Sequence, residues 1–343
     1  MKYMDWREMK EWLKNERISP FSLKHGLMEL LFVWAFYAYA YSRGYLFKGF
    51  MENIAVEAEK EYKAEEERKK AAEEERKIYA NDDNIKAIVE REIGRYGRKG
   101  DLNHIIVTNV TNMKSLFAYS EFNGDISGWD VSNVRDMTCM FERSKFNGDI
   151  SQWDVGNVEE MTWMFQRAEF TGDNGGISGW NVSNVRNMCR MFEYSDFNGD
   201  VSKWDVSKVR DMMGMFGYTK FNGDISEWDV RNVYAIGSMF AGSKFDGDLS
   251  RWDVSNVSSM GGLFEDSSFT GKNGDISGWN LSVVKYGNKV FLNSPFSGDV
   301  SGWEVEYTHN TYAMFEGLDI EKMPYSFVPW KLKNKLKQGK ADN

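Results

Sequence analysis

Apolar side chains recur along residues 105–316 with a fixed period, which the tryptophans mark most clearly. The intervals between successive tryptophans are 24, 27, 24, 24, 24, 27 and 24 residues. The eight tryptophans are Trp129, Trp153, Trp180, Trp204, Trp228, Trp252, Trp279 and Trp303. Both longer intervals carry three extra residues at the same place, within segments 171–178 and 270–277. An insertion confined to one point of the period marks a loop, so each unit is one small supersecondary element.

Each unit contains two apolar patterns in succession. In residues 126–132, Trp129 and Val131 alternate with polar residues, which predicts a short strand with one buried face. The apolar residues from Val134 to Phe141 have the spacing of a helical stripe and predict one or two turns of helix. Residues 147–149 (Asn-Gly-Asp) predict a turn. Because such a unit cannot enclose a core alone, the pattern predicts an α/β repeat solenoid of eight stacked strand–helix coils.

Stacking would place equivalent residues of neighbouring coils about 4.8 Å apart, so the tryptophan, valine, methionine and phenylalanine columns would form rows inside. Another column consists of asparagines: Asn133, Asn157, Asn184, Asn232 and Asn256. We expect these amides to bond backbone groups between coils, because backbone groups that are buried need partners at every coil. The alternative is that they are only turn residues.

The unit that begins at Trp129 reads WDVSNVRDMTCMFERSKFN. It resembles the hallmark of the BspA-like leucine-rich-repeat surface-protein family, W-D-V-S-N-V-x-x-M-x-x-M-F-x-x-S-x-F-N. The resemblance covers residues 105–316, and segment 81–105 resembles that family's leading element. It implies an LRR-like solenoid and a cell-surface, host-contact or virus-associated binding protein, without implying one ligand.

The segments that flank the repeats predict caps. In residues 81–104 an apolar stripe predicts an N-terminal capping helix whose start is capped by polar side chains. The stripe consists of Ile85, Ile88, Val89 and Ile93, and the candidate capping residues are Asp82, Asp83 and Asn84. Residues 317–343 predict a C-terminal cap followed by a basic tail.

Residues 27–50 contain the most apolar stretch of the chain. The run from Leu27 to Phe47 is long enough to cross a bilayer, which predicts a membrane anchor helix. The candidate anchor residues are Leu30, Leu31, Phe32, Trp34, Phe36 and Tyr37. Two alternatives remain open: a buried helix that packs on partner chains, and a signal peptide, for which the preceding segment is too long and too charged.

Two further segments on the N-terminal side are polar or amphipathic. The pattern of residues 1–26 predicts a short amphipathic helix. In residues 51–80, glutamates and lysines recur at helical spacing, as in Glu59–Lys63 and Glu65–Lys69, which predicts a charged helical stalk. A flexible charged linker is the alternative.

Charge and composition exclude several classes of function. The chain has a formal net charge of −9, and residues 105–316 contain 29 acidic and 17 basic side chains. This excess of negative charge argues against nucleic acid as a partner, because binding to phosphates requires cationic side chains. The three histidines lie far apart and no phosphate-binding loop is present, so we expect neither an enzyme, a cofactor nor a metal centre. Cys139 and Cys189 lie two coils apart and are expected to be free thiols.

Two columns of carboxylates could bind ligands. One follows the glycine of each turn: Asp125, Asp149, Asp200, Asp224, Asp248, Asp275 and Asp299. Calcium could bridge these side chains, although capping of local N–H groups is the alternative we favour. The second column is expected on the outer face of the predicted strand, where a cationic partner could bind: Asp130, Asp154, Asp205, Asp229 and Asp253.

The positions that differ between units are expected to face solvent or a partner, and they include Trp163, Tyr194 and Tyr218. Together these features predict a non-enzymatic, membrane-anchored surface protein whose repeats bind a protein or another macromolecule. The alternative is a structural component of a virus or phage particle, with the N-terminal helices docked on other subunits or on an internal membrane.

Overall fold

The computed structural model describes residues 48–174, 176–305, 310–311, 313–316 and 318, and divides the chain into two units, Met1–Arg76 and Lys77–Asn343. The described part of the first unit is one helix, α3 (Lys48–Arg76). The ammonium group of Lys63 lies 2.7 Å from Glu59 and that of Lys69 lies 3.0 Å from Glu65. The helix ends before residue 80, the limit expected for the stalk, because Ile78 already begins a strand. No helix in the described ranges combines the length and the apolar character needed to cross a membrane.

The second unit begins with a β-α-β arrangement. Strand β1 (Ile78–Asn81) is followed by helix α4 (Ile85–Tyr96) and strand β2 (Ile105–Asn109). The two strands pair in parallel, with Ile78 opposite Ile105. Helix α4 buries Ile85, Ile88 and Val89 of the apolar stripe, and also Glu92, whereas Ile93 is only partly buried. Because α4 is shorter than segment 81–104, the capping segment consists of a strand end, a helix and a loop.

The start of α4 differs from the expected capping pattern. Asn84 makes no side-chain cap bond to the helix. The Asp82 carboxylate instead accepts hydrogen bonds from the N–H groups of Thr111 and Asn112, at 2.7 and 3.0 Å, and from the Thr111 hydroxyl. Burial acts to raise the pKa of Asp82, but these hydrogen bonds outweigh it and hold that pKa below its ordinary value. Asp82 therefore fastens the chain before the helix to the first turns after β2.

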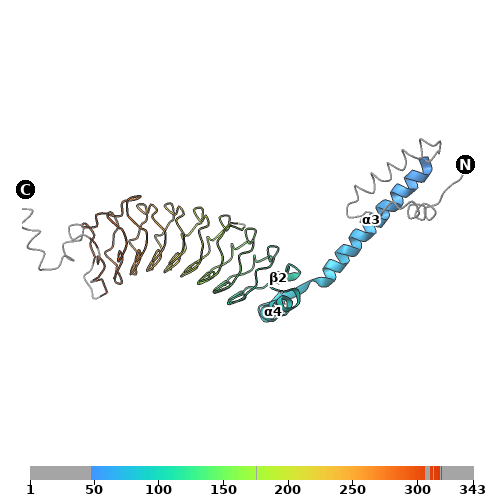
Figure 1. Ribbon diagram of the computed structural model, residues 1–343, viewed down its shortest axis with the longest axis horizontal. Coiled ribbons are helices and arrows are strands. Elements are labelled where there is room, and N and C mark those ends of the chain that lie inside the picture. The colour runs from blue at the N-terminus through green and yellow to red at the C-terminus, as the bar shows by residue number, and fades with distance from the viewer. Residues whose placement is uncertain (1–47, 175, 306–309, 312, 317, 319–343) are drawn as a thin grey trace, which may run out of the picture. The chain divides into compact units, whose positions relative to one another are not determined.

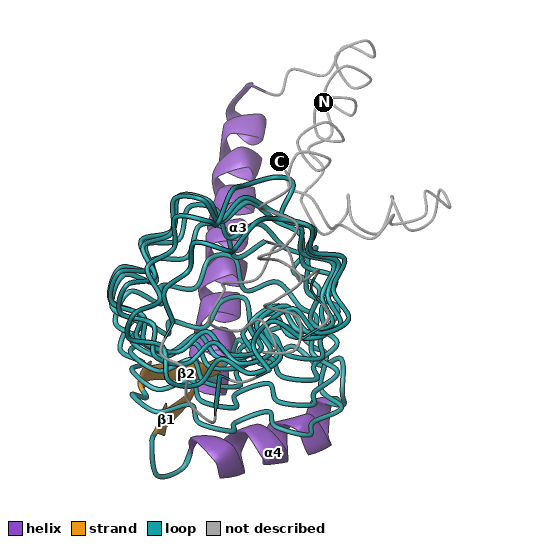
Figure 2. Ribbon diagram, turned by 90° about the vertical axis from the view of Figure 1, so that its left-hand side faces the viewer, coloured by secondary structure: helices purple, strands orange, loops and turns teal. Residues whose placement is uncertain are grey.

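From β2 onward the chain winds in successive coils, which Figure 1 shows side by side and Figure 2 shows nearly end-on, with overlapping outlines. Isolated parallel bridges join equivalent residues of consecutive coils, from Asn112–Asp136 to Ser259–Tyr286. This region contains turns and bridges, with no α-helix and no extended strand among its described residues. The strand expected over residues 126–132 and the helix expected over residues 134–141 are therefore wrong, although the repeat itself is present.

No helix forms over residues 134–141 because many of its backbone N–H donors bond to neighbouring coils. The N–H groups of Met137, Cys139 and Phe141 donate to carbonyls of the next coil at 2.8–2.9 Å. Those of Met140 and Glu142 close turns onto residues three positions earlier, both at 3.1 Å. Because alternate donors leave the coil, a continuous helical ladder cannot form. Cys139 also has φ = 56°, a left-handed conformation that a right-handed helix excludes.

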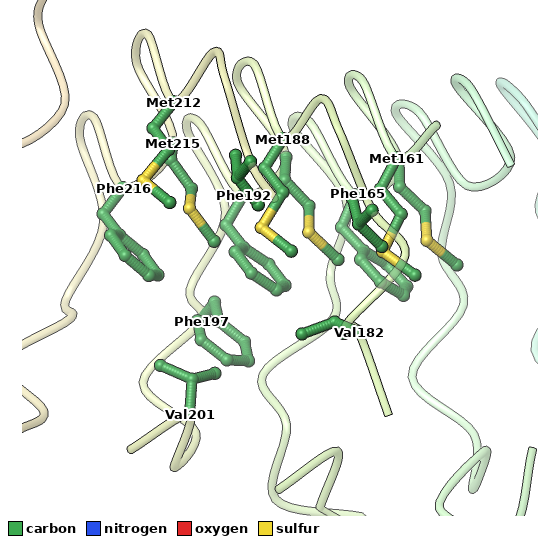
Figure 3. Packing of buried hydrophobic residues seen from close by; sticks show 14 of the residues in the cluster. Met161, Phe165, Val182, Met188, Phe192, Phe197, Val201, Met212, Met215 and Phe216 are labelled. Carbon is green, nitrogen blue, oxygen red and sulfur yellow. The ribbon is translucent and has the colours of Figure 1, made fainter. Parts of the chain in front are cut away.

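The predicted internal rows are present and buried. All eight repeat tryptophans have at most 5% of their surface exposed. Figure 3 shows methionine and phenylalanine rows, such as Phe165, Phe192 and Phe216, passing from coil to coil. The rings of Phe141 and Phe165 are 5.3 Å apart and parallel within 5°, which is offset stacking. One hydrophobic core therefore runs through the repeats and includes residues of α4 and β2.

The asparagine column bonds backbone between coils, as expected. The amide nitrogens of Asn133, Asn157 and Asn184 donate to the carbonyls of Thr108, Ser132 and Gly156 at 2.7–2.9 Å. Asn232 and Asn256 make equivalent bonds to Ser207 and Arg231. The same coils are linked by the indole N–H groups, each of which donates to a carbonyl of the preceding coil: Trp129, Trp153, Trp180, Trp204, Trp228, Trp252, Trp279 and Trp303.

Candidate interaction surface

One row of side chains on the outside of the coils combines exposed aromatic rings with arginines. Tyr119, Arg143, Arg167, Tyr194 and Tyr218 occupy equivalent positions in five successive coils and have φ between 51° and 59°. Their N–H groups donate to carbonyls of the next coil at 2.6–2.9 Å. Each backbone position is thus held by the coil that follows it. We call these five residues the aromatic–arginine strip.

In three of the four neighbouring pairs of the strip, flat groups face each other. The rings of Tyr194 and Tyr218 are 4.4 Å apart with an angle of 3° between their planes. The Arg167 guanidinium lies 4.3 Å from the centre of the Tyr194 ring, and that of Arg143 lies 5.5 Å from the Tyr119 ring. Both distances are within the range of cation–π attraction.

The strip ends at Gly242, the next residue in the same column. A Cβ atom at Gly242 would lie 2.4 Å from Cδ1 of Tyr218, so the tyrosine ring covers this glycine closely. Even so, 42% of the surface of Tyr218 and 42% of that of Tyr194 remain exposed. Partial burial and the adjacent Tyr194 raise the pKa of Tyr218, so its hydroxyl stays protonated at neutral pH.

Trp163 lies in a different column from the two tyrosines. It shares the left-handed column of Cys139 and Arg190 and is 37% exposed. In the described ranges it has no ring contact with Tyr194 or Tyr218. The structure therefore joins two of the three aromatic candidates and adds Tyr119, Arg143 and Arg167. These three share the 24- or 27-residue spacing of the column, which is the signal that could have identified them.

The outer aspartate column has a role within the coil. Oδ1 of each of these residues accepts the N–H two positions later: Asp130, Asp154, Asp205, Asp229 and Asp253. The hydroxyl and N–H of Ser132 hold the pKa of Asp130 below its ordinary value. Asp229 also forms an ion pair with Arg231 at 2.7 Å. These carboxylates shape turns, and binding of a cationic partner to them stays a prediction.

The aspartates that follow the turn glycines are arranged in the same way. Oδ1 of each accepts the N–H two residues later, at 2.8–3.0 Å: Asp125, Asp149, Asp200, Asp224, Asp248, Asp275 and Asp299. This is the local capping that the sequence offered as the alternative to calcium. Over the described residues, no three His, Cys, Asp or Glu side chains are grouped so that they could hold a metal ion. The candidate anchor residues 30–37 and the segment 319–343 lie outside the described residues.

Comparison with known families gives one result. The model of a family described as "Mycoplasma protein of unknown function, DUF285" matches residues 94–193, 169–273 and 218–327. The chain belongs to this family. The three overlapping matches follow the DUF285 repeats through most of the second unit. No curated protein and no solved structure matches the chain.

Proposed function

We propose that this DUF285 chain is a non-enzymatic binding protein that presents the aromatic–arginine strip to a partner protein on a surface. In this proposal the repeats form an LRR-like solenoid of the BspA-like kind, and residues 27–47 anchor the chain in a membrane. The helix α3 separates these two parts along the sequence.

The observation that carries the proposal is the parallel contact between Tyr194 and Tyr218, with the Arg167 guanidinium over the ring of Tyr194. Tyrosine and arginine are enriched at protein interfaces and at their energetic hot spots. Aromatic rings that are already held by stacking lose little conformational entropy when a partner binds. The backbone under both rings is fixed by bonds from Tyr194 to Gly217 and from Tyr218 to Ala241.

A binding comparison between two matched variants tests this role. The full-length chain is immobilised and exposed to candidate cell surfaces, and the retained proteins are quantified. We expect Tyr194→Ala/Tyr218→Ala to reduce the retained partner by about tenfold or more. Tyr286→Ala serves as the control, because this exposed tyrosine lies outside the strip. Equal retention by the double variant and the wild type would exclude the strip as the binding surface.

The anchor is tested separately with the full-length chain and lipid vesicles. An anchored chain floats with the vesicles and stays with them in high salt, because apolar burial is not screened by ions. Release by salt alone would contradict the anchor and favour docking of the N-terminal segments on other subunits of a particle.

A further inference from the structure

A hollow on the outside of the repeats is lined by three cationic side chains. This hollow is half open to solvent, has a volume of about 220 Å³ and is lined by Arg186, Lys208, Arg210 and Asn232. Arg186 and Arg210 are equivalent residues of consecutive coils, joined by a backbone bond from the N–H of Arg210 to the carbonyl of Arg186 at 2.9 Å. The backbone positions of equivalent residues in neighbouring coils are about 4.8 Å apart. At this spacing the positive charges of the two side chains repel each other unless an anion lies between them.

In this column one carboxylate, Glu159, is shared by two arginines. Glu159 lies between two arginines, 3.7 Å from Arg135 and 3.3 Å from Arg186. In the part of the chain that the structure describes, no carboxylate lies within ion-pair distance of Arg210. The adjacent Asp211 directs Oδ1 to the N–H of Met213 at 2.9 Å.

Lys208 adds a cation at a position where the fold requires none. The equivalent residues in other coils include Asn157, Asn184 and Asn232, whose amides bond the preceding coil. Lys208 breaks this row, and its ammonium group donates to Oδ1 of Asn184 at 2.7 Å. Among the described residues, no carboxylate forms an ion pair with Lys208. The bond from Lys208 to Asn184 links two neighbouring coils, but a neutral amide does the same elsewhere in this row. The stacking of coils therefore explains neither the positive charge of Lys208 nor that of Arg210, which has no ion pair among the described residues. This clustering is notable because the repeats contain 29 acidic and only 17 basic side chains.

We propose that this hollow, which we call the basic pocket, binds a tetrahedral oxyanion: phosphate or sulfate, either free or as a monoester. Arg186 and Arg210 offer planar sets of N–H donors suited to two oxygens of such a group. Lys208 contributes a point charge with rotatable donors. An oxyanion held among the three groups would remove their mutual repulsion. This site is independent of the aromatic–arginine strip.

Isothermal titration of the full-length chain tests the basic pocket. The probes are inorganic phosphate, inorganic sulfate and glucose 6-phosphate, each at constant ionic strength, so that screening by salt does not change. We expect saturable binding of one anion per chain. Tighter binding of glucose 6-phosphate than of phosphate would identify a monoester as the ligand, and the opposite order would identify the free ion.

Two substitutions and a matched control complete the experiment. Lys208→Asn restores the residue that the repeat uses elsewhere, so this variant is expected to fold, and Arg210→Gln removes the unpaired charge. Each should weaken binding by about tenfold, the effect of losing one charge-assisted hydrogen bond. Lys244→Asn removes an exposed charge outside the pocket and should leave the affinity unchanged. No saturable binding by the wild type, or equal weakening by Lys244→Asn, would overturn the proposal.

Discussion

The indole N–H of Trp153 donates a hydrogen bond of 3.2 Å to the backbone carbonyl of Ile126, 27 residues earlier in the chain. The same carbonyl accepts the backbone N–H of Trp129 at 3.1 Å, so one oxygen joins two coils. The arrangement recurs at Ile150, which accepts from the backbone of Trp153 and from the indole of Trp180. Tryptophan therefore contributes both buried apolar area and a directional bond that sets the register of neighbouring coils.

Substitution of one core tryptophan should test this double role. Trp204→Phe removes the bond to the Ile177 carbonyl and leaves unfilled volume in the core. We expect the free energy of unfolding to fall by about 2–3 kcal/mol. The measurement is urea denaturation, with Trp163→Phe as the control. Because Trp163 is partly exposed, its substitution should change stability by less than about 0.5 kcal/mol. Equal effects of the two substitutions would contradict the role assigned to Trp204.

The asparagine column predicts two changes of opposite sign. Asn157→Ala removes the bond to the Ser132 carbonyl and should lower the free energy of unfolding by about 1 kcal/mol. Lys208→Asn removes the bond from Lys208 to Asn184, but it introduces the amide that this coil lacks and relieves the repulsion from Arg186 and Arg210. We therefore expect a net rise in the free energy of unfolding of up to about 1 kcal/mol. Thermal unfolding of both variants and the wild type shows whether each substitution raises or lowers the free energy of unfolding. Destabilisation by Lys208→Asn would show that the column does not act uniformly from coil to coil.

Much of this architecture follows from repetition in the sequence. The rows of Trp129 and Asn133 were predictable because identical residues return at a spacing that only stacking makes useful. The left-handed backbone at Cys139 and Arg143 was harder to predict, since neither residue type favours a positive φ. A signal was nevertheless present in the equivalent glycines, Gly214 and Gly262 in the Cys139 column and Gly242 in the Arg143 column. These glycines argue against a helix over residues 134–141.

The candidate binding residues were predictable only in part. Variation between units correctly placed Tyr194 and Tyr218 on the outside, but a ring contact depends on side-chain direction, which spacing alone does not give. For the aspartates in the turns, the sequence indicates the position but not the role. A carboxylate such as Asp130 could attract a cation or accept a local N–H, and the sequence is compatible with both.

A buried carboxylate in α4 should make stability depend on pH. Glu92 is fully buried and lies 3.1 Å from Nε2 of His104 and 2.8 Å from Arg91. Burial acts to raise the pKa of Glu92, but the bonds from Arg91 and His104 and the charge of Arg95 outweigh it and lower that pKa. A lowered pKa in the folded state means that the ionised form stabilises the fold above the unfolded pKa and that this stabilisation is lost on acidification.

The substitution Glu92→Gln tests this dependence. Near neutral pH it should lower the free energy of unfolding by about 1–3 kcal/mol, because charge-assisted bonds become neutral ones. The difference in the free energy of unfolding between this variant and the wild type should shrink as the pH falls below about 4. Thermal unfolding across this pH range measures it, with the exposed Glu90→Gln as the control. A difference that stays constant down to acidic pH would contradict the lowered pKa.

The two cysteines should be unreactive in the folded protein. Each is free and only 8% exposed. Burial, with a smaller contribution from Glu142, raises the pKa of Cys139 to about 11. Burial, with a smaller contribution from Asp211, raises that of Cys189 to about 12. Because the thiolate is the reactive form, we expect slow alkylation of the native chain at neutral pH.

Mass spectrometry after iodoacetamide treatment checks this expectation. The native chain should remain unmodified over a time in which the urea-unfolded chain takes up two labels. Rapid labelling of either thiol in the native chain would show that its coil opens readily or is packed differently.

Hydrogen exchange at the indole nitrogens, followed by NMR with tryptophan-to-phenylalanine variants for assignment, tests the stacked-coil architecture most directly. We expect the Nε1–H groups of the eight repeat tryptophans to exchange slowly, since each is buried and bonded to the preceding coil. The indole of Trp163, which donates no hydrogen bond within the described ranges, should exchange rapidly. Exchange of the eight repeat indoles as fast as that of Trp163 would show that these tryptophans are not held between stacked coils.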